Sequence, residues 1–270
     1  MTRLAEARIS TAALAYNLQV ARAHAGRARV MAVVKSNGYG HGLLDVAGAL
    51  RRADAFAVCC LEEAVPLREA GYMHPILLLE GVFEPDELAL VARYRLDMGL
   101  HSEWQLRLLE TSPKTRPINV WLKVDSGMHR LGFALDRVAD VHRRLLACRS
   151  VAPHIRLMSH FACADDRDNP RTGEQWRCFD QATEGLPGER SLANSAGLLG
   201  WPDARRDWVR PGVMLYGVNP FADDRSAPVL KPAMTLVSRI IAINEIDAGE
   251  PVGYAGTWVC PERMPVGIVA

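Results

Sequence analysis

Long hydrophobic runs are missing from this 270-residue sequence. No stretch approaches the unbroken apolar length of a membrane span, and residues 1–17 lack the basic and apolar regions of a secretory signal. An excess of charge of one sign is also missing, because 32 Lys and Arg residues stand against 31 Asp and Glu residues. The composition therefore disfavours membrane insertion, export and binding to nucleic acid.

Paired cysteine motifs are missing as well. The six cysteines lie scattered, with no CxxC pair and no nearby histidine at the spacing of a zinc site. We therefore expect no metal centre, and we expect reduced cysteines in a cytoplasmic protein. Hydrophobic residues make up 49% and charged residues 23% of the chain, which is typical of a folded domain with a substantial core.

Short apolar runs rich in β-branched residues recur along most of the chain, and helical spacing of apolar residues separates many of them. We predict strands at residues 30–34, 55–59, 76–79, 95–98, 118–124, 155–161, 191–194 and 208–215. We predict helices at residues 43–50, 62–69, 85–94 and 137–146. Alternating strands and helices indicate parallel βαβ units, and eight of them favour an α/β fold of the (β/α)8, or TIM, barrel type.

The pattern changes after Pro228. Residues 234–243, 251–254 and 266–270 predict successive strands separated by turns, without helices between them. We therefore expect a barrel over residues 1–228 and the beginning of a β-rich domain over residues 229–270. Because the sequence stops directly after the apolar run 266–269, we expect this second domain to be incomplete.

Lys35 follows the apolar strand predicted at residues 30–34 and precedes a glycine-rich segment. In a barrel, this position lies at the rim that carries active sites. A lysine that ends a buried strand is costly to desolvate unless it is neutral or covalently joined to a partner, such as an aldehyde cofactor in a Schiff base. Taken by itself, the pattern also fits a glycine-rich turn with a lysine that extends to solvent.

The longer segment at residues 33–42, Val-Val-Lys-Ser-Asn-Gly-Tyr-Gly-His-Gly, resembles the cofactor-attachment signature of the alanine racemase family. Members of that family depend on pyridoxal 5'-phosphate (PLP). The resemblance implies that Lys35 carries PLP, that Tyr39 lies near the cofactor phosphate, and that a barrel precedes a β-domain.

Further segments resemble the same family in the same order. Residues 122–132 contain Arg130, which by resemblance contacts the phenolic oxygen of PLP and the substrate carboxylate, two anionic groups that suit a guanidinium. Lys123 matches a position that is N-carboxylated in many members, although an unmodified, salt-bridged lysine fits the sequence nearly as well. His160, within residues 159–165, matches a residue close to the cofactor, with a buried structural histidine as the alternative.

The last two predicted barrel strands are followed by segments where barrels commonly bind phosphate. By resemblance, the Ser195 hydroxyl and the backbone amides of Gly212 and Val213 bind the PLP phosphate through neutral donors. Arg210 resembles the arginine that faces the pyridine nitrogen, where a permanent cation disfavours protonation. The ring would then withdraw electrons less strongly, which favours racemisation over transamination.

Racemisation requires acid–base groups on both faces of the α-carbon, and Lys35 serves only one of them. Residues 251–258 resemble the family segment with the second base, which implies this role for Tyr254. In the family this tyrosine comes from the neighbouring subunit, so the resemblance also implies a homodimer.

The resemblance implies an enzyme that interconverts L-alanine and D-alanine, either to supply D-alanine for peptidoglycan or to degrade it. Three alternatives stay open: a racemase of another amino acid such as serine, a related PLP-dependent decarboxylase, and a non-enzymatic PLP-binding homeostasis protein built from the barrel alone. Arg210 argues against the decarboxylase, and Tyr254 with the strands after Pro228 argues against the barrel-only protein.

Overall fold

The computed structural model describes residues 4–112, 116–221 and 228–270. The chain forms two compact units, Ser10–Ala233 and a second unit that combines Met1–Ile9 with Met234–Ala270. Residues 4–9 group with the C-terminal ones because β1 (Glu6–Ile9) pairs antiparallel with β10 (Met234–Val237). Local sequence patterns do not reveal such a long-range pairing.

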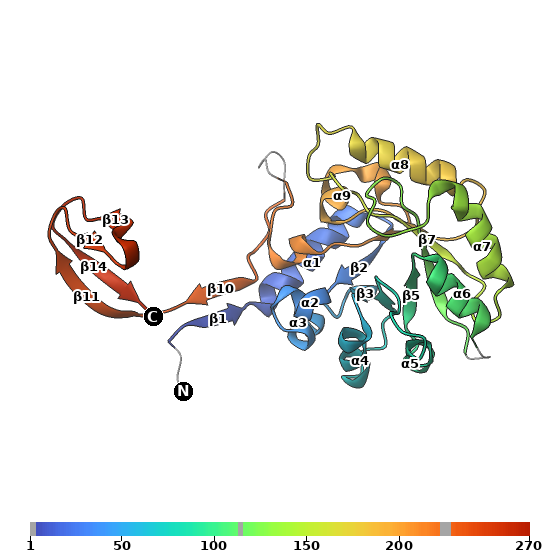
Figure 1. Cartoon of the computed structure of the whole chain (residues 1–270), viewed down its shortest axis with the longest axis horizontal. Coiled ribbons are helices and arrows are strands. Elements are labelled where there is room, and N and C mark those ends of the chain that lie inside the picture. The colour runs from blue at the N-terminus through green and yellow to red at the C-terminus, as the bar shows by residue number, and fades with distance from the viewer. Residues whose placement is uncertain (1–3, 113–115, 222–227) are drawn as a thin grey trace. The chain divides into compact units, whose positions relative to one another are not determined.

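The larger unit is the predicted (β/α)8 barrel (Figure 1). Its eight strands are parallel, and the last pairs with the first through Arg29 beside Trp208 and Val30 beside Val209. Neighbouring strands of the barrel follow one another in chain order. They are β2 (Arg29–Val33), β3 (Ala55–Val58), β4 (Ile76–Leu78), β5 (Asp97–Leu100), β6 (Asn119–Lys123), β7 (Arg156–Met158), β8 (Arg190–Ser191) and β9 (Trp208–Val209).

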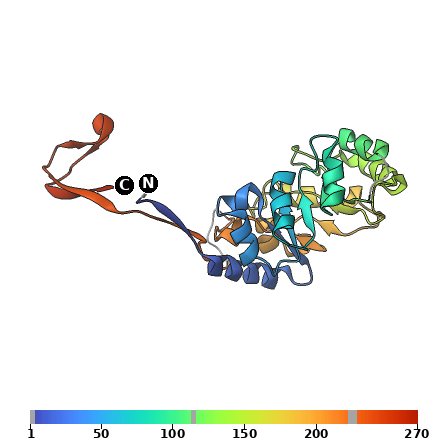
Figure 2. The ribbon, with the colours of Figure 1, turned by 90° about the horizontal axis from the view of Figure 1, so that it is seen from below.

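Helices cover the outside of the barrel, and α1 packs beside the last barrel elements, η3 and α9 (Figure 1, Figure 2). The four predicted helical segments are helical. Serine or asparagine side chains cap the first turns of α1, α6 and α9. The helices are α1 (Thr11–Ala25), α2 (Lys35–Tyr39), α3 (Leu43–Ala49), α4 (Leu61–Glu69), α5 (Glu87–Arg93), α6 (Glu103–Thr111), α7 (Val138–Ala147), α8 (Arg171–Ala182) and α9 (Ser195–Gly200), with 3-10 turns η1 (Leu135–Arg137), η2 (Pro202–Ala204) and η3 (Val213–Tyr216).

The prediction of one strand over residues 208–215 is wrong in its second half. Strand β9 ends at Val209, because Pro211 has no backbone N–H for a sheet and Gly212 turns the chain with φ −120° and ψ −91°. The following residues form η3. This early end places a tight turn, and not a strand, at the rim of the barrel.

Alternate residues of the strands fill the barrel interior, as the two-residue period of a strand requires. Met31 with Val33 and Ala55 with Ala57 point inward, and the rings of Trp121 and Trp208 meet nearly edge to face at 5.8 Å. The intervening strand residues face the helices and are also buried. The near-continuous apolar strands of the sequence therefore pack on both faces.

A buried polar network lies toward the amino ends of the strands. Asp97 is 4% exposed and accepts hydrogen bonds from Trp121 Nε1 at 3.0 Å and Asn119 Nδ2 at 2.9 Å. Arg156 lies 3.4 Å from the same carboxylate and stacks over the ring of Trp121. Asp97 thus ties β5, β6 and β7 together at the end opposite to Lys35.

The smaller unit consists of antiparallel pairs, β1 with β10, β11 (Ile240–Ile246) with β14 (Met264–Val269), and β12 (Pro251–Val252) with β13 (Trp258–Val259). The prediction of one strand over residues 234–243 is wrong. The strand is interrupted at Ser238 and Arg239, because β10 and β11 pair with different partner strands. The short turn η4 (Tyr254–Gly256) separates β12 from β13. Across both units, no helix within the described residues is long and apolar enough to cross a bilayer.

We expect Asp97→Ala to lower the free energy of unfolding by about 3 kcal/mol, because it leaves an indole N–H, an amide and a guanidinium without their buried acceptor. Urea denaturation of the variant, beside Asp136→Ala at an exposed position, measures the effect. Equal stabilities of the two variants would contradict the role assigned to Asp97.

Candidate active site

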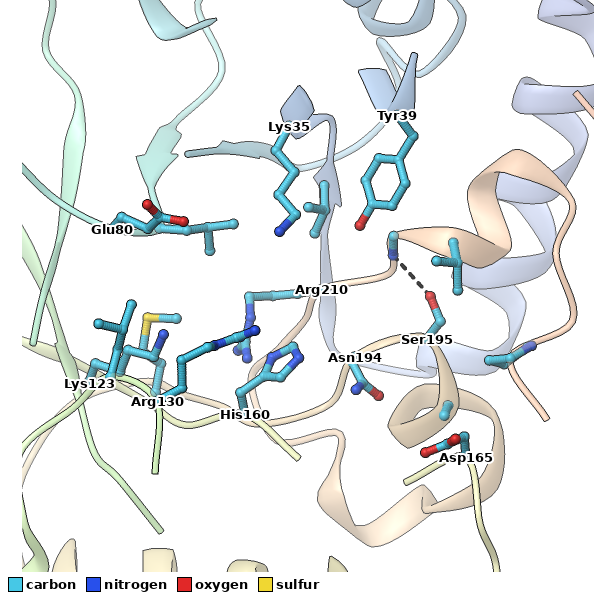
Figure 3. A pocket seen from close by; sticks show the side chains of 18 residues that line it. Lys35, Tyr39, Glu80, Lys123, Arg130, His160, Asp165, Asn194, Ser195 and Arg210 are labelled. Atoms are coloured by element: carbon cyan, nitrogen blue, oxygen red, sulfur yellow. Dashed lines mark hydrogen bonds between the residues drawn. The ribbon is translucent and has the colours of Figure 1, made fainter. Parts of the chain in front are cut away.

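A cavity of about 400 Å³ opens at the carboxyl ends of the barrel strands. Lys35 and Tyr39 reach into it from one side, and Arg130 and His160 approach from the other (Figure 3). Nine of the ten residues predicted from the sequence to form the site line this cavity. They are Lys35, Tyr39, Lys123, Arg130, His160, Ser195, Arg210, Gly212 and Val213.

The backbone after Lys35 takes an unusual path. Ser36, Asn37, Gly38 and Tyr39 have φ angles between 52° and 62°, and Gly40 has φ 80°, so the segment is a left-handed helical turn. Each non-glycine residue in this conformation costs about 1–2 kcal/mol, less for asparagine. The sequence predicted a glycine-rich loop here, but not this handedness. Strain of this kind persists where surrounding contacts enforce it, and it is common at functional sites.

The left-handed turn directs Tyr39 toward Gly212. The Tyr39 ring stacks on Tyr216 with centroids 4.5 Å apart, and the Tyr216 hydroxyl donates to the carbonyl of Val33 at 3.2 Å. A Cβ atom on Gly212 would lie only 2.4 Å from the Tyr39 hydroxyl. Glycine is therefore required at residue 212 for the close approach of this hydroxyl to the rim turn.

Ser195 lies across this end of the cavity from Tyr39 and binds the rim turn. Its hydroxyl oxygen accepts from the backbone N–H group of Gly212 at 3.0 Å (Figure 3) and from that of Met214 at 3.3 Å. With its acceptor sites used in this way, the hydroxyl hydrogen is available to a ligand oxygen. The hydroxyls of Ser195 and Tyr39 and the Val213 amide of the rim turn thus form a neutral, hydrogen-bonding cup.

Arg210 is a deeply buried cation, only 3% exposed. Its guanidinium donates to the Ser191 hydroxyl and to the carbonyls of Ser159 and Leu192. Burial lowers its pKa to about 10, so it remains charged at neutral pH. Neutral acceptors rather than a carboxylate hold this cation, which leaves its positive potential free to act on the cavity.

Lys123 and His160 respond to burial and to neighbouring positive charge. Burial, followed by the charges of Arg210 and Arg130, lowers the pKa of Lys123 to about 8. Burial, followed by the charges of Arg210, Lys123 and Arg130, lowers the pKa of His160 to about 3, so its imidazole is neutral near pH 7. Because the pKa of Lys123 is about 8, about 10% of this side chain is the neutral amine at pH 7.

Hydrogen bonds within the loop, and one from α8, hold the loop that carries Arg130. Asp125 Oδ1 accepts the backbone N–H groups of Gly127 and His129, both at 3.0 Å, and His129 is left-handed at φ 57°. Arg171 of α8 donates to the Gly127 carbonyl at 2.9 Å. Arg130 itself extends beside the cavity as an exposed side chain.

Sequence reasoning missed three polar residues of the cavity wall, Glu80, Asp165 and Asn194. Glu80 comes directly after the strand predicted at residues 76–79, so the strand-end rule that selected Lys35 applies to it too. Asp165 and Asn194 fall inside family-like segments but were given no role. Asn194 also accepts the Gly197 N–H at 2.9 Å and so caps α9.

Tyr254, the tenth sequence-selected residue, belongs to the smaller unit. It begins the turn η4, which contains left-handed Ala255 (φ 60°) and Gly256 (φ 57°). Its side chain is fully exposed on this unit.

Among the residues that the structure describes, the cavity combines four cationic side chains, Lys35, Lys123, Arg130 and Arg210, with two carboxylates, Glu80 and Asp165. Such an excess of positive charge favours a ligand with several anionic groups, and the volume suits a small molecule. A parallel barrel with a lysine, arginines and a hydrogen-bonding cup at its strand ends defines the class of barrel enzymes that act on small anionic ligands.

Comparison with known proteins is consistent with this class and narrows it. The chain matches the family descriptions "Alanine racemase, N-terminal domain" over residues 9–220 and "Alanine racemase, C-terminal domain" over residues 233–270. It is 52% identical to an alanine racemase of Halorhodospira halophila, over 100% of this chain and 75% of that protein.

Solved structures of alanine racemases share the fold of this chain. The biosynthetic alanine racemase of Pseudomonas aeruginosa superposes with a TM-score of 0.93 at 42% identity, over 99% of this chain and 75% of that one. An alanine racemase of Bartonella henselae, described with covalently bound pyridoxal phosphate, has a TM-score of 0.86 at 28% identity, over 99% and 75% of the two chains.

The chain belongs to the alanine racemase family, whose members are amino-acid racemases and therefore isomerases. This confirms the family predicted from the segments around Lys35 and Arg130. The match at residues 233–270 separates the chain from a protein built from the barrel alone.

The lowered pKa of Lys123 leads to a pH-dependent stability. Because the folded pKa of about 8 lies below the ordinary 10.5, the unfolded chain binds more protons between these values, and stability rises with pH across this window. We expect Lys123→Met to be about 2 kcal/mol more stable than the wild type at pH 7, with a difference that shrinks as pH rises from 8 toward 10.5.

Denaturant titrations in CO2-free buffer at several pH values measure this difference. Lys231→Met, at an exposed lysine, is the control and shows no such trend. A stability difference for Lys123→Met that stays constant from pH 7 to pH 10.5 would contradict the role of its buried charge.

Proposed function

We propose that this protein interconverts L-alanine and D-alanine, with PLP held on Lys35. The observation that carries the proposal is the convergence of nine sequence-selected residues on one cavity. That cavity has cations at one end and a neutral hydrogen-bonding cup at the other. The names of its relatives support alanine as the substrate.

The residues of the cavity fit PLP chemically. Tyr39, Ser195 and the backbone amides of Gly212 and Val213 would bind the phosphate, since hydroxyls and amides can hold an anion without adding positive charge. The Gly212 amide would exchange its Ser195 acceptor for a phosphate oxygen. Gly212 is suited to this cup because a Cβ would lie 2.4 Å from the Tyr39 hydroxyl and displace it. Lys35 reaches the cavity from the same side as Tyr39 (Figure 3), so one turn would supply both the attachment point and a phosphate ligand.

PLP, when bound, withdraws electrons from the α-carbon of an attached amino acid and makes its proton acidic. Arg210 would face the pyridine nitrogen, and its guanidinium remains charged at neutral pH because its pKa stays near 10. This cation disfavours a proton on the ring nitrogen. Arg210 would thereby favour return of the proton to the α-carbon, and so racemisation over transamination.

Two bases would move the proton. Lys35 Nζ would take it from the α-carbon of D-alanine or return it there, and Tyr254 Oη would do the same on the opposite face for L-alanine. The complete exposure of Tyr254 on its turn fits a residue that acts in the cavity of a partner subunit. We therefore include a homodimer in the proposal.

Arg130 would bind the substrate carboxylate and the phenolic oxygen of PLP, since its guanidinium offers several donors. His160 lies nearby as a neutral imidazole and can donate or accept a hydrogen bond without adding charge. The neutral amine of Lys123, present near pH 7 because of its lowered pKa, would add CO2, release one proton to solvent and become a carbamate anion beside Arg130. Carboxylation of Lys123 is thus part of the proposal. The proposed role of the reaction is to supply D-alanine for peptidoglycan or, alternatively, to degrade it.

Borohydride reduction of the PLP-loaded protein tests the attachment site. We expect mass spectrometry to find the cofactor on Lys35, and Lys35→Ala to lower conversion of L-alanine to D-alanine by about 10³-fold because one proton-transfer group is lost. Labelling of Lys123 or Lys231 instead would contradict the proposal. Faster conversion of serine than of alanine would reassign the substrate but keep the chemistry.

The two-base assignment has its own test in Tyr254→Phe. In D2O we expect exchange of the α-proton of L-alanine to slow by about 10²- to 10⁴-fold, whereas exchange in D-alanine continues because Lys35 is intact. Proton NMR follows both enantiomers, and Tyr94→Phe in the barrel unit is the control. Equal slowing for both enantiomers would refute opposite faces for the two bases.

A further inference from the structure

The left-handed turn after Lys35 requires something to hold it. Its own hydrogen bonds, from Gly38 N–H to Val34 O and from Gly40 N–H to Ser36 O, are both 2.9 Å long. They close a turn of either hand and do not select this one. Ser36 and Tyr39 are neither glycine nor asparagine, so their left-handed backbone is unfavourable without outside support.

Glu63 provides a contact from outside the turn. It lies in the first turn of α4, and its two carboxylate oxygens accept different backbone N–H groups. Oε1 accepts from Asn37, inside the left-handed turn, at 3.0 Å, and Oε2 accepts from Cys59, just after β3, at 3.0 Å. One side chain therefore joins the lysine turn to the end of the neighbouring barrel strand.

Asn37 transmits this contact further along the turn. Its side-chain oxygen accepts the backbone N–H of Leu43 at 2.9 Å, and its carbonyl accepts that of Gly42 at 3.0 Å. The segment from Lys35 to the start of α3 is thus tied to a residue whose N–H is bound by Glu63. Both bonds to Glu63 are charge-assisted and stronger than neutral ones.

We propose that Glu63 is a positioning residue that sets the direction of Lys35 and Tyr39 by anchoring the left-handed turn to β3. Glu63 does not line the cavity, so it acts through the backbone and not on the ligand. This inference rests on the proposed function, because it assigns Glu63 to the placement of the PLP-bearing lysine.

Glu63→Gln tests it in the PLP-loaded protein. The amide oxygen can accept only one of the two N–H groups, and its NH2 group faces the other as a second donor. We expect the rate of PLP attachment to Lys35, followed by absorbance, to fall at least about fivefold, and kcat for racemisation to fall about tenfold. KM for alanine should change less than twofold, because Arg130 lies on a different strand end.

Glu62→Gln is the matched control, because Glu62 is its exposed neighbour in the same helical turn and interacts with Cys60. It should keep wild-type attachment and kcat. Glu63→Asp, one methylene shorter, keeps the charge but cannot span both N–H groups, and it should show an intermediate loss. This variant decides the question if Glu63→Gln does not fold.

Wild-type attachment rate and kcat in folded Glu63→Gln, or in Glu63→Asp when the former is unfolded, would overturn the positioning role, whatever the change in melting temperature. A rise in KM with unchanged kcat would overturn it too. If the wild-type protein itself attaches no PLP at Lys35, the proposed function fails first, and this outcome is visible before any Glu63 variant is measured.

Discussion

The mutual repulsion of positive charges around one cavity, two of them buried, is the constraint on which this site depends. Lys35, Lys123, Arg130 and Arg210 converge at one end of the barrel, and among the described residues the cavity offers them two carboxylates. Burial and then the charges of Arg210 and Arg130 lower the pKa of Lys123, whereas burial alone lowers the pKa of Arg210. An anionic ligand relieves this repulsion, so the same charges that disfavour the folded chain favour binding.

The barrel tolerates this cluster because its opposite end is closed by satisfied polar contacts. Asp97 binds Trp121, Asn119 and Arg156 there, with the indole rings packed above. The two ends therefore differ in kind: one pairs its buried charges, and the other leaves cations facing a cavity. Such a division, with stability at the amino ends and chemistry at the carboxyl ends of the strands, is general for parallel barrels.

The sequence predicted the order of strands and the cavity residues because both depend on local signals. Strand ends are marked by polar residues after apolar runs, as at Lys35, and parallel strands bring their carboxyl ends to one rim. The same rule applied to Glu80 would have found it. The left-handed path of residues 36–40, the early end of β9 and the contact of Glu63 with Asn37 had no such signal, because each depends on residues from separate elements.

By itself, then, the sequence determined the family, the barrel and the identity of the side chains at its rim, since periodicity and short motifs are properties of neighbouring residues. Only the tertiary structure decided how those side chains point and how they ionise. The pKa of Lys123 depends on burial and then on the charge of Arg210, far away in the chain. The approach of Tyr39 to Gly212 depends on a turn of reversed hand. Burial, charge proximity and backbone strain arise from contacts between distant segments, and these exist only once the barrel has closed.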